Sequence, residues 1–245
     1  MAKRQFKRKL KRRRHGTAFW DNEYASGGEY LALSENESED LAKFSRWLKR
    51  QKDALPLSRD SKVLDLGCGN GRNLIFLSRN FGVSGVGYDI SSAAIAKARR
   101  AGKDLPLTFE TRSVAGVLDL PDNSQDLVLD MMSSHFLSES ERASLRDEAY
   151  RVLRPGGWLF MKTFLRDGDL HTERLLKAVP TKEAGTYMHP VIGVPEHAYF
   201  EEELTDFLSE KFLVKKVYRS HKHISRGKAR KRRTISVYAE KDPYK

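Results

Sequence analysis

The chain has 245 residues, a mass of 28.0 kDa and a formal net charge of +12, from 45 Lys and Arg against 33 Asp and Glu. This length suits one domain with a full core, and we find no apolar run of about 20 residues to cross a membrane and no apolar stretch behind the basic N-terminal residues to make a secretory signal. The single cysteine, Cys68, excludes a disulfide framework and zinc held by paired cysteines, and it favours the reducing cytoplasm.

The N-terminal part of the sequence consists of a basic segment followed by aromatic residues. Residues 1–15 contain nine Lys or Arg and no acid, so we expect them to be a disordered tail and residues 16–245 to form the domain. Phe19, Trp20 and Tyr24 are too many aromatic residues for a linker, and they either cover a ligand pocket or pack beneath the first helix. That helix is predicted by an apolar face at Leu41, Phe44, Trp47 and Leu48.

The chain is organised around a strand and the glycine-rich loop that follows it. The apolar run 63–66 predicts a buried strand, which ends at Gly67, and a helical pattern over 72–80 comes next. Glycines at 67, 69 and 71 permit a sharp turn and leave room for a ligand beside a helix N-terminus. No Gly-Lys-Ser/Thr follows, which disfavours a triphosphate site of the Walker type.

Two acidic residues indicate which ligand this loop takes. Asp65 lies at the end of the first strand, where it would repel a pyrophosphate but attract a cation. Asp89 ends the next apolar run, 83–88, a position from which a carboxylate accepts hydrogen bonds from the two ribose hydroxyls of an adenine nucleoside. A nucleoside with a positive group and no phosphates fits S-adenosylmethionine better than NAD.

The rest of the sequence alternates between helices and strands. The predicted elements are a helix capped by Ser91, the strand 105–109, the strand 127–129, the helix 138–153, the strand 158–164, the helix 200–208 and the strands 212–218 and 234–239. Strands separated by helices predict a parallel doubly wound sheet. Residues 165–199 interrupt the alternation with prolines and glycines, and we expect this insertion to lie over the strand ends, where a substrate enters.

The motifs together resemble those of a known family. Asp-Leu-Gly-Cys-Gly-Asn-Gly at 65–71, followed by Asp89, resembles motifs I and II of class I S-adenosylmethionine-dependent methyltransferases, and Leu-Arg-Pro-Gly-Gly at 153–157 resembles the turn before their fifth strand. Gly-Arg-Asn at 71–73 is closest to the loop of tellurite-resistance-type methyltransferases. The resemblance implies methyl transfer and a Rossmann-like α/β fold: a doubly wound, mostly parallel seven-stranded sheet with a C-terminal antiparallel hairpin, whose loop is the basic segment 219–233.

The resemblance also assigns residues to the cofactor S-adenosylmethionine. It places Asp65 near the methionine amino group and Asp89 on the ribose, with Ile90 and Val114 on either side of the adenine. Family members commonly carry an acid where this chain has Val114, which leaves the adenine amino group to Ser113 or a backbone carbonyl. The predicted cofactor-binding residues are Asp65, Gly67, Cys68, Gly69, Asn70, Asn73, Asp89, Ile90, Ser113, Val114, Asp130 and Met131.

The methyl-acceptor side is expected after the fourth strand and in the insertion. Asp-Met-Met-Ser-Ser-His-Phe at 130–136 lacks the Pro-Pro of amino-methylating nucleic-acid enzymes and resembles the Ser/Leu-His segment of small-molecule and RNA methyltransferases. His135 is the candidate general base, with a hydrogen bond to the loop backbone as its alternative role. We predict no metal site. The predicted substrate-side residues are Tyr24, Tyr187, His189 and His197.

The uneven charge bears on the acceptor. Residues 219–233 contain eight Lys or Arg and no acid; without both basic segments the chain carries 28 basic and 33 acidic residues. This distribution favours RNA or a ribonucleoprotein as partner, bound through residues 3–14 and 219–233, although such a run can also be solvated surface. A small thiol, chalcogen or metabolite is the alternative acceptor. A third hypothesis is a non-catalytic, cofactor-binding factor in RNA assembly.

Overall fold

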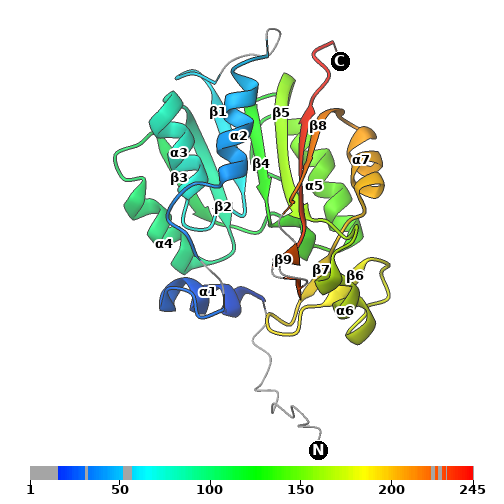
Figure 1. Ribbon diagram of the computed structural model, residues 1–245. Coiled ribbons are helices and arrows are strands. Elements are labelled where there is room, and N and C mark those ends of the chain that lie inside the picture. Colours follow the sequence, from blue (N-terminus) through cyan, green and yellow to red (C-terminus); the bar gives the residue numbers. More distant parts are fainter. Residues whose placement is uncertain are drawn as a thin grey trace, which may run out of the picture.

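The computed structural model describes residues 16–30, 33–51, 57–221, 224–225, 228–229 and 231–244. The predicted tail 1–15 lies outside them. In the described part, a seven-stranded sheet in the order β3-β2-β1-β4-β5-β11-β8 forms the centre of the molecule (Figure 1). Its strands are β1 (Lys62–Leu66), β2 (Ser84–Asp89), β3 (Leu107–Thr111), β4 (Gln125–Met131), β5 (Leu153–Phe164), β8 (Leu213–Arg219) and β11 (Thr234–Glu240).

The strand directions confirm the predicted Rossmann-like sheet. Strands β1 to β5 pair in parallel, whereas β11 lies antiparallel between β5 and β8. The third strand begins at Leu107, two residues later than predicted. Pro106 has no amide hydrogen to donate, and its carbonyl accepts a bond from the Gly85 amide before the regular pairing begins.

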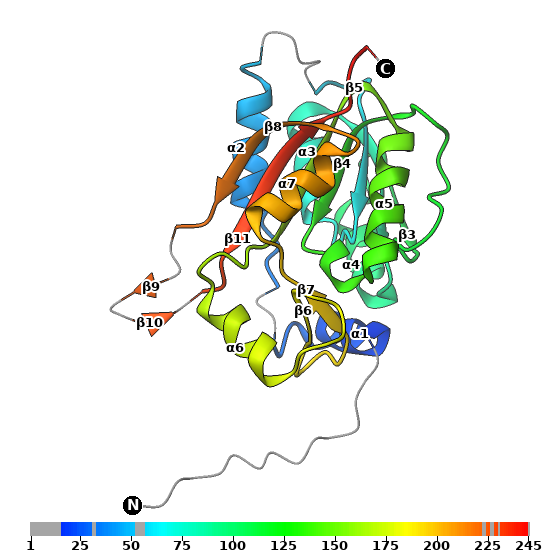
Figure 2. The ribbon, with the colours of Figure 1, turned by 90° about the vertical axis from the view of Figure 1, so that its right-hand side faces the viewer.

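Helices cover both faces of the sheet. The helices α2 (Glu39–Leu48), α3 (Arg72–Phe81) and α4 (Ser92–Ala101) pack on one face, and α5 (Glu139–Val152) and α7 (Glu201–Ser209) pack on the other (Figures 1 and 2). Alternate strand residues enter the two cores, so that Val63 packs with α2 and α3 while its neighbour Leu64 packs with α5. Strands buried on both faces need continuous apolar runs, which is why the sequence revealed them.

A further group of elements lies beyond the carboxyl ends of the parallel strands. Helix α1, helix α6 and the β6–β7 hairpin form the lower end of the molecule in both views (Figures 1 and 2), and β7 contacts the short helix η1 that follows β4. The insertion therefore lies over the carboxyl ends of the parallel strands. These elements and two short strands of the basic segment are α1 (Gly16–Ser26), η1 (Ser134–Phe136), α6 (Leu170–Ala178), β6 (Thr186–Met188), β7 (Pro195–His197), β9 (Ile224–Ser225) and β10 (Lys228–Ala229).

None of the helices in the described ranges combines the length and the apolar character that crossing a membrane requires.

Candidate active site

The glycine-rich loop after β1 lies between α1 and the segment that follows β4. Gly67 and Gly69 have φ angles of +71° and +56°, in the region that favours glycine. A Cβ on Gly67 would lie 2.3 Å from the Ser133 Cβ, and a Cβ on Gly69 would lie 2.3 Å from the Tyr24 hydroxyl oxygen. Both positions therefore require glycine for conformation and for space.

Asp89 connects the end of β2 to this loop. One carboxylate oxygen accepts a hydrogen bond of 2.8 Å from the Gly69 amide, and the other accepts one of 2.8 Å from the Ser91 amide. Burial raises the pKa of Asp89, against the lowering effect of these two bonds. Because a carboxylate has about four acceptor sites, each oxygen retains capacity for a further donor, which suits a pair of ribose hydroxyls.

Asp65 is a buried carboxylate at the floor of the loop. It is 1% exposed, and its Oδ2 has no hydrogen-bond partner among the described residues. Burial, followed by the neighbouring charge of Asp89, raises the pKa of Asp65 to about 7, while Arg72 acts in the opposite direction. A buried carboxylate with an unpartnered oxygen is costly unless a cation or donor meets it, so this site fits a group that carries an ammonium.

Tyr24 brings α1 onto the loop. Besides its approach to Gly69, its hydroxyl lies in the electrostatic field of Asp89 and Asp65, and burial and these charges raise its pKa, so the phenol stays protonated. The sequence left open whether the aromatic residues of this segment cover the pocket or pack beneath a helix. In the structure the two aromatic residues differ: Phe19 is buried, whereas Tyr24 lies over the glycine loop.

The polar residues that extend the loop bind the chain between α1 and α2. The Asn70 side chain donates to the Ser34 carbonyl at 3.1 Å, and Arg72 donates to the Asn36 carbonyl at 3.0 Å. Asn73 accepts from the Ser38 amide at 3.0 Å, and its amide nitrogen lies 3.3 Å from the Met131 sulfur. The Gly-Arg-Asn extension therefore holds the segment that leads into α2 against the glycine loop.

A sequence profile of the family described as a methyltransferase domain matches residues 63–157, from the first residue of the β1 core to the Pro-Gly-Gly turn in β5. This stretch contains both carboxylates and the glycine loop. The chain carries a class I S-adenosylmethionine-dependent methyltransferase domain.

Known relatives agree with this assignment. The chain is 32% identical over 155 residues to a 27-O-demethylrifamycin SV methyltransferase of Amycolatopsis mediterranei, a match that covers 62% of this chain and 50% of the relative. It is 33% identical over 129 residues to a fatty-acid O-methyltransferase of Mycolicibacterium smegmatis, covering 52% of this chain and 46% of the relative. The chain therefore spans about half the length of these curated relatives.

A solved structure shares the fold over almost its whole length. The S-adenosylmethionine-dependent methyltransferase from Methanosarcina mazei superposes with a TM-score of 0.64 at 25% identity, over 76% of this chain and 94% of that protein.

On the predicted adenine side, the methyltransferase domain places three residues near the end of β2. Ile90 is half-buried, and Val114 is 8% exposed and packs with Tyr88 in the core. Ser113 is exposed, and its hydroxyl accepts a bond of 3.1 Å from the Ala115 amide. The cysteine of the loop, Cys68, is buried; burial raises its pKa well above the ordinary value, so the thiol is unreactive.

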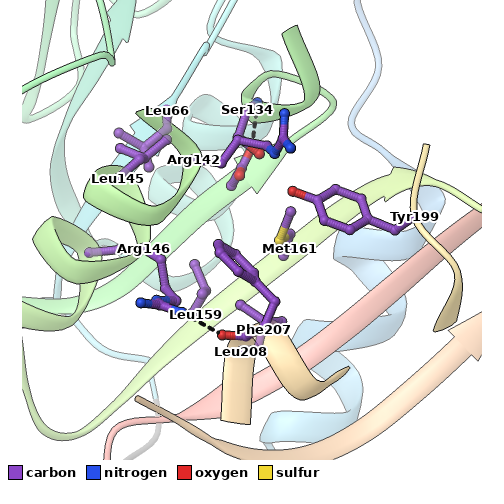
Figure 3. Close-up of a pocket in the computed structure, with 12 residues that line it drawn as sticks. Leu66, Ser134, Arg142, Leu145, Arg146, Leu159, Met161, Tyr199, Phe207 and Leu208 are labelled. Atoms are coloured by element: carbon purple, nitrogen blue, oxygen red, sulfur yellow. Dashed lines mark hydrogen bonds between the residues drawn. The ribbon is translucent and has the colours of Figure 1, made fainter. Parts of the chain in front are cut away.

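The end of β4 is held in a hydrogen-bonded turn. Asp130 is 5% exposed and accepts from the Ser134 amide at 3.1 Å, and burial raises its pKa. A cavity of about 20 Å³ lies behind this turn, and in Figure 3 the Tyr199 hydroxyl points toward Arg142 and Ser134 at its polar end. This volume holds about one water molecule and is too small for a methyl acceptor.

His135 occupies a closed aromatic environment next to this turn. Its side chain is 1% exposed, and its ring lies 4.2 Å from the Phe136 ring and 5.1 Å from the Phe164 ring, measured between centroids. Its Nδ1 finds no partner in the part of the chain that the structure describes. Burial lowers the pKa of His135 to about 4, although the nearby Glu196 charge opposes this effect, so the imidazole is neutral near pH 7.

The insertion brings a buried ionic cluster to the same region. The Tyr187 hydroxyl donates to the carboxylate of Glu196, which is 2% exposed, and Arg232 from the C-terminal hairpin forms an ion pair with the same carboxylate. Arg232 also lies 3.5 Å from Asp169 and 3.5 Å from the centre of the Phe164 ring. The sequence did not reveal this arrangement, because Arg232 belongs to a run of basic residues that looked like exposed surface.

The two predicted substrate-side histidines have different surroundings. The Nδ1 of His189 accepts bonds from the amides of Val191 (3.3 Å) and Ile192 (3.1 Å), so its proton resides on Nε2, 3.9 Å from Glu196. His197 is 2% exposed and lies between the hydroxyl of Thr186 at 2.8 Å and the carboxylate of Glu203 at 2.9 Å. His189 therefore borders the ionic cluster around Glu196, whereas the ring nitrogens of His197 are used by Thr186 of the insertion and by Glu203 of α7.

Three arginines of the basic segment 219–233 make contacts within the domain. Three of its guanidinium groups bind the chain itself: Arg219 pairs with Glu201, Arg232 enters the cluster described above, and Arg233 donates to the Asp167 carbonyl at 2.6 Å. Arg219 and Arg232 are therefore paired with carboxylates of this chain, whereas Arg233 donates to a backbone carbonyl, which carries no charge. Binding of RNA by this segment stays a prediction. The side chains of Lys222, Arg226, Lys228 and Arg230 lie outside the described part.

Across the described ranges, no three His, Cys, Asp or Glu side chains are placed so that they hold a metal ion.

Proposed function

We propose that this chain transfers the methyl group of S-adenosylmethionine to a small-molecule nucleophile. Asp65 and Asp89 would hold the cofactor: the unpartnered oxygen of Asp65 meets the amino group of its methionine part, and the remaining acceptor sites of Asp89 take the ribose hydroxyls. Gly67 and Gly69 give the backbone approach, and Ile90 and Val114 flank the adenine. The cofactor supplies the reactive methyl carbon, and the protein aligns the two reactants.

The burial of His135 is the observation that favours a small methyl acceptor. The imidazole is 1% exposed beneath the aromatic residues of η1 and β5. The imidazole is neutral and its Nδ1 is unpartnered; in the tautomer with the proton on Nε2, Nδ1 would accept a hydrogen bond from the O–H or N–H of the nucleophile and direct the lone pair of the attacking atom. An acceptor must fit under the insertion to reach this nitrogen, which favours a compact molecule over a folded RNA. The two curated relatives named above are, by their names, methyltransferases of small molecules and lipids.

The decisive test is incubation of the full chain with cofactor labelled at the methyl group and a fractionated cell extract. Label that remains in the small-molecule fraction after nuclease and protease treatment supports the proposal. The matched control is Asp89→Ala, which should lose transfer through cofactor binding. Cofactor binding without label in any fraction would instead favour a non-catalytic protein. Fractionation of the source cells should recover the protein in the cytoplasmic fraction, because a reducing cytoplasm keeps its single thiol reduced.

RNA is the second candidate acceptor, because residues 1–15 contain nine Lys or Arg and no acid. Neutralising several phosphates gives binding a steep salt dependence. If RNA is the acceptor, deletion of residues 1–15 should weaken RNA binding and flatten this dependence. If a small molecule is the acceptor, the same deletion should leave turnover unchanged.

A further inference from the structure

One carboxylate of helix α1 binds the N-terminal end of α4. Asp21 Oδ1 accepts hydrogen bonds from the Ser91 hydroxyl (2.9 Å), the Ser92 hydroxyl (3.2 Å) and the Ala93 amide (3.2 Å). These donors form the N-terminal end of α4, where the helix dipole favours a negative charge. Partial burial raises the pKa of Asp21, but the bonds from Ala93, Ser91 and Ser92 outweigh it and leave the pKa below its ordinary value.

From this attachment, α1 reaches both halves of the active site. Tyr24 rests on Gly69, next to the two carboxylates that we assign to the cofactor. Four residues earlier, on the same side of the helix, the Trp20 ring lies 5.5 Å from the Phe136 ring, adjacent to His135. One short helix therefore covers the loop that receives the cofactor and the residues that flank the acceptor.

The chain after α1 provides a point about which the helix can turn. Gly27 and Gly28 follow it directly, with φ angles of +85° and +91°, and a Cβ on Gly27 would have no heavy atom within 4 Å. The next fixed points are the backbone groups of residues 34–38, which Asn70, Arg72 and Asn73 hold to the glycine loop. Gly27, which has open space around it, and Gly28, whose amide donates to the Glu23 carbonyl at 2.8 Å, thus separate α1 from an anchored segment.

We propose that α1 is a lid on the cofactor site, latched by Asp21, and that S-adenosylmethionine enters and leaves when Asp21 releases the N-terminus of α4. This inference rests on the cofactor placement proposed above. With the latch made, the Tyr24 hydroxyl covers Gly69 and the region between Asp65 and Asp89. Asp21 acts here as a positioning residue, since it controls the lid and does not touch the reactants.

Ligand-exchange kinetics of the full-length chain test the latch without any acceptor. S-adenosylhomocysteine, the demethylated product, serves as the probe, and stopped-flow tryptophan fluorescence reports lid motion through Trp20, with Trp20→Phe to identify its signal. Asp21→Ala should speed both association and dissociation on the order of tenfold, because bonds to a charged acceptor are lost. A variant that merely damaged the fold would not associate faster. Asp104→Ala, in an exposed position just after α4, is the matched control.

A second variant keeps the proposal testable if Asp21→Ala is poorly folded. In the double variant Asp21→Cys with Ser92→Cys, purified in its oxidised form, the lid is covalently closed. Association of S-adenosylhomocysteine should be at least tenfold slower than in the reduced form and should recover on reduction. Equal rates in the two forms, or unchanged association in a folded Asp21→Ala, would overturn the lid. Absence of binding to the wild-type chain would contradict the cofactor placement instead.

Discussion

The Asp89 carboxylate accepts a hydrogen bond of 2.8 Å from the amide of Gly69. This bond joins the end of β2 to the loop after β1, so the residue proposed to bind the ribose also shapes the loop around the cofactor. It also keeps a second negative charge next to Asp65, which is one reason why the pKa of Asp65 is raised.

Cofactor binding is expected to release a proton. Burial and Asp89 raise the pKa of Asp65 to about 7, so below pH 7 the free protein holds a proton that the ammonium of the ligand must displace. Affinity for S-adenosylhomocysteine should therefore rise between pH 6 and 8. Calorimetry at pH 6 in buffers of different ionisation enthalpy should show release of close to one proton. Asp65→Asn should abolish the release and weaken binding about tenfold to a hundredfold. Equal proton release in that variant would contradict the assignment.

The stability of the unliganded protein should decrease at acid pH because of His135. Its folded pKa of about 4 lies below its ordinary value of 6.5, so the unfolded chain binds more protons between these values and stability falls as pH drops through this window. The contribution amounts to about 3 kcal/mol. In urea unfolding between pH 7 and pH 4, the free energy of unfolding should decrease less for His135→Gln than for the wild type. The exposed histidine variant His221→Gln should retain the wild-type slope.

Arg232 should be important for folding despite its place in a basic run. Arg232→Ala leaves the buried Glu196 carboxylate without the guanidinium that pairs with it, and the loss of a buried partner costs about 3–5 kcal/mol. The control Arg100→Ala replaces an exposed residue of α4, and its free energy of unfolding should stay within about 0.5 kcal/mol of the wild-type value. Adding Glu196→Gln to Arg232→Ala should recover part of the loss. Thermal unfolding of the four proteins decides this, and equal effects of the two arginine variants would count against the cluster.

Gly69→Ala should disturb α1 as well as the loop. The new Cβ would meet the Tyr24 hydroxyl at 2.3 Å, whereas in Gly27→Ala, also at a positive φ, it would meet no atom within 4 Å. The free energy of unfolding of the control Gly27→Ala should fall by about 1–2 kcal/mol, the cost of the left-handed conformation, and that of Gly69→Ala should fall by more. Tyr24→Ala should relieve part of that excess in a double-variant cycle, measured by chemical denaturation. Strict additivity would show that the two residues do not meet.

The sequence was informative wherever one local pattern determined the structure. Buried strands such as β1 are recognisable in the sequence as apolar runs. Ser91 caps α4 as predicted, and its hydroxyl accepts a hydrogen bond of 3.1 Å from the Ala94 amide. The helix α1 escaped prediction because its sequence has no amphipathic face: it is fixed by contacts to the loop after β1 and to the start of α4, which lie far along the chain.

The acceptor side was only partly predictable for the same reason. His135 followed from its place after the fourth strand. In the structure the charges of Glu196 and Arg232 act on its imidazole, and Glu196 also accepts the Tyr187 hydroxyl. The pairing of Arg232 with Glu196 joins the short strand β7 to a residue 36 positions further along the chain, and no periodicity records such a contact. Charge counting alone could not show that Arg219 and Arg232 pair with carboxylates of this chain.

The position of β11 determines when this protein can finish folding. The strand lies between β5 and β8, and β8 has its only sheet neighbour there among the described residues. During synthesis, residues 213–219 therefore remain an unpaired edge until residues 234–240 leave the ribosome. A chaperone that shields this nascent edge should therefore favour the native protein over an aggregate, and a chain truncated before residue 234 should keep the edge exposed.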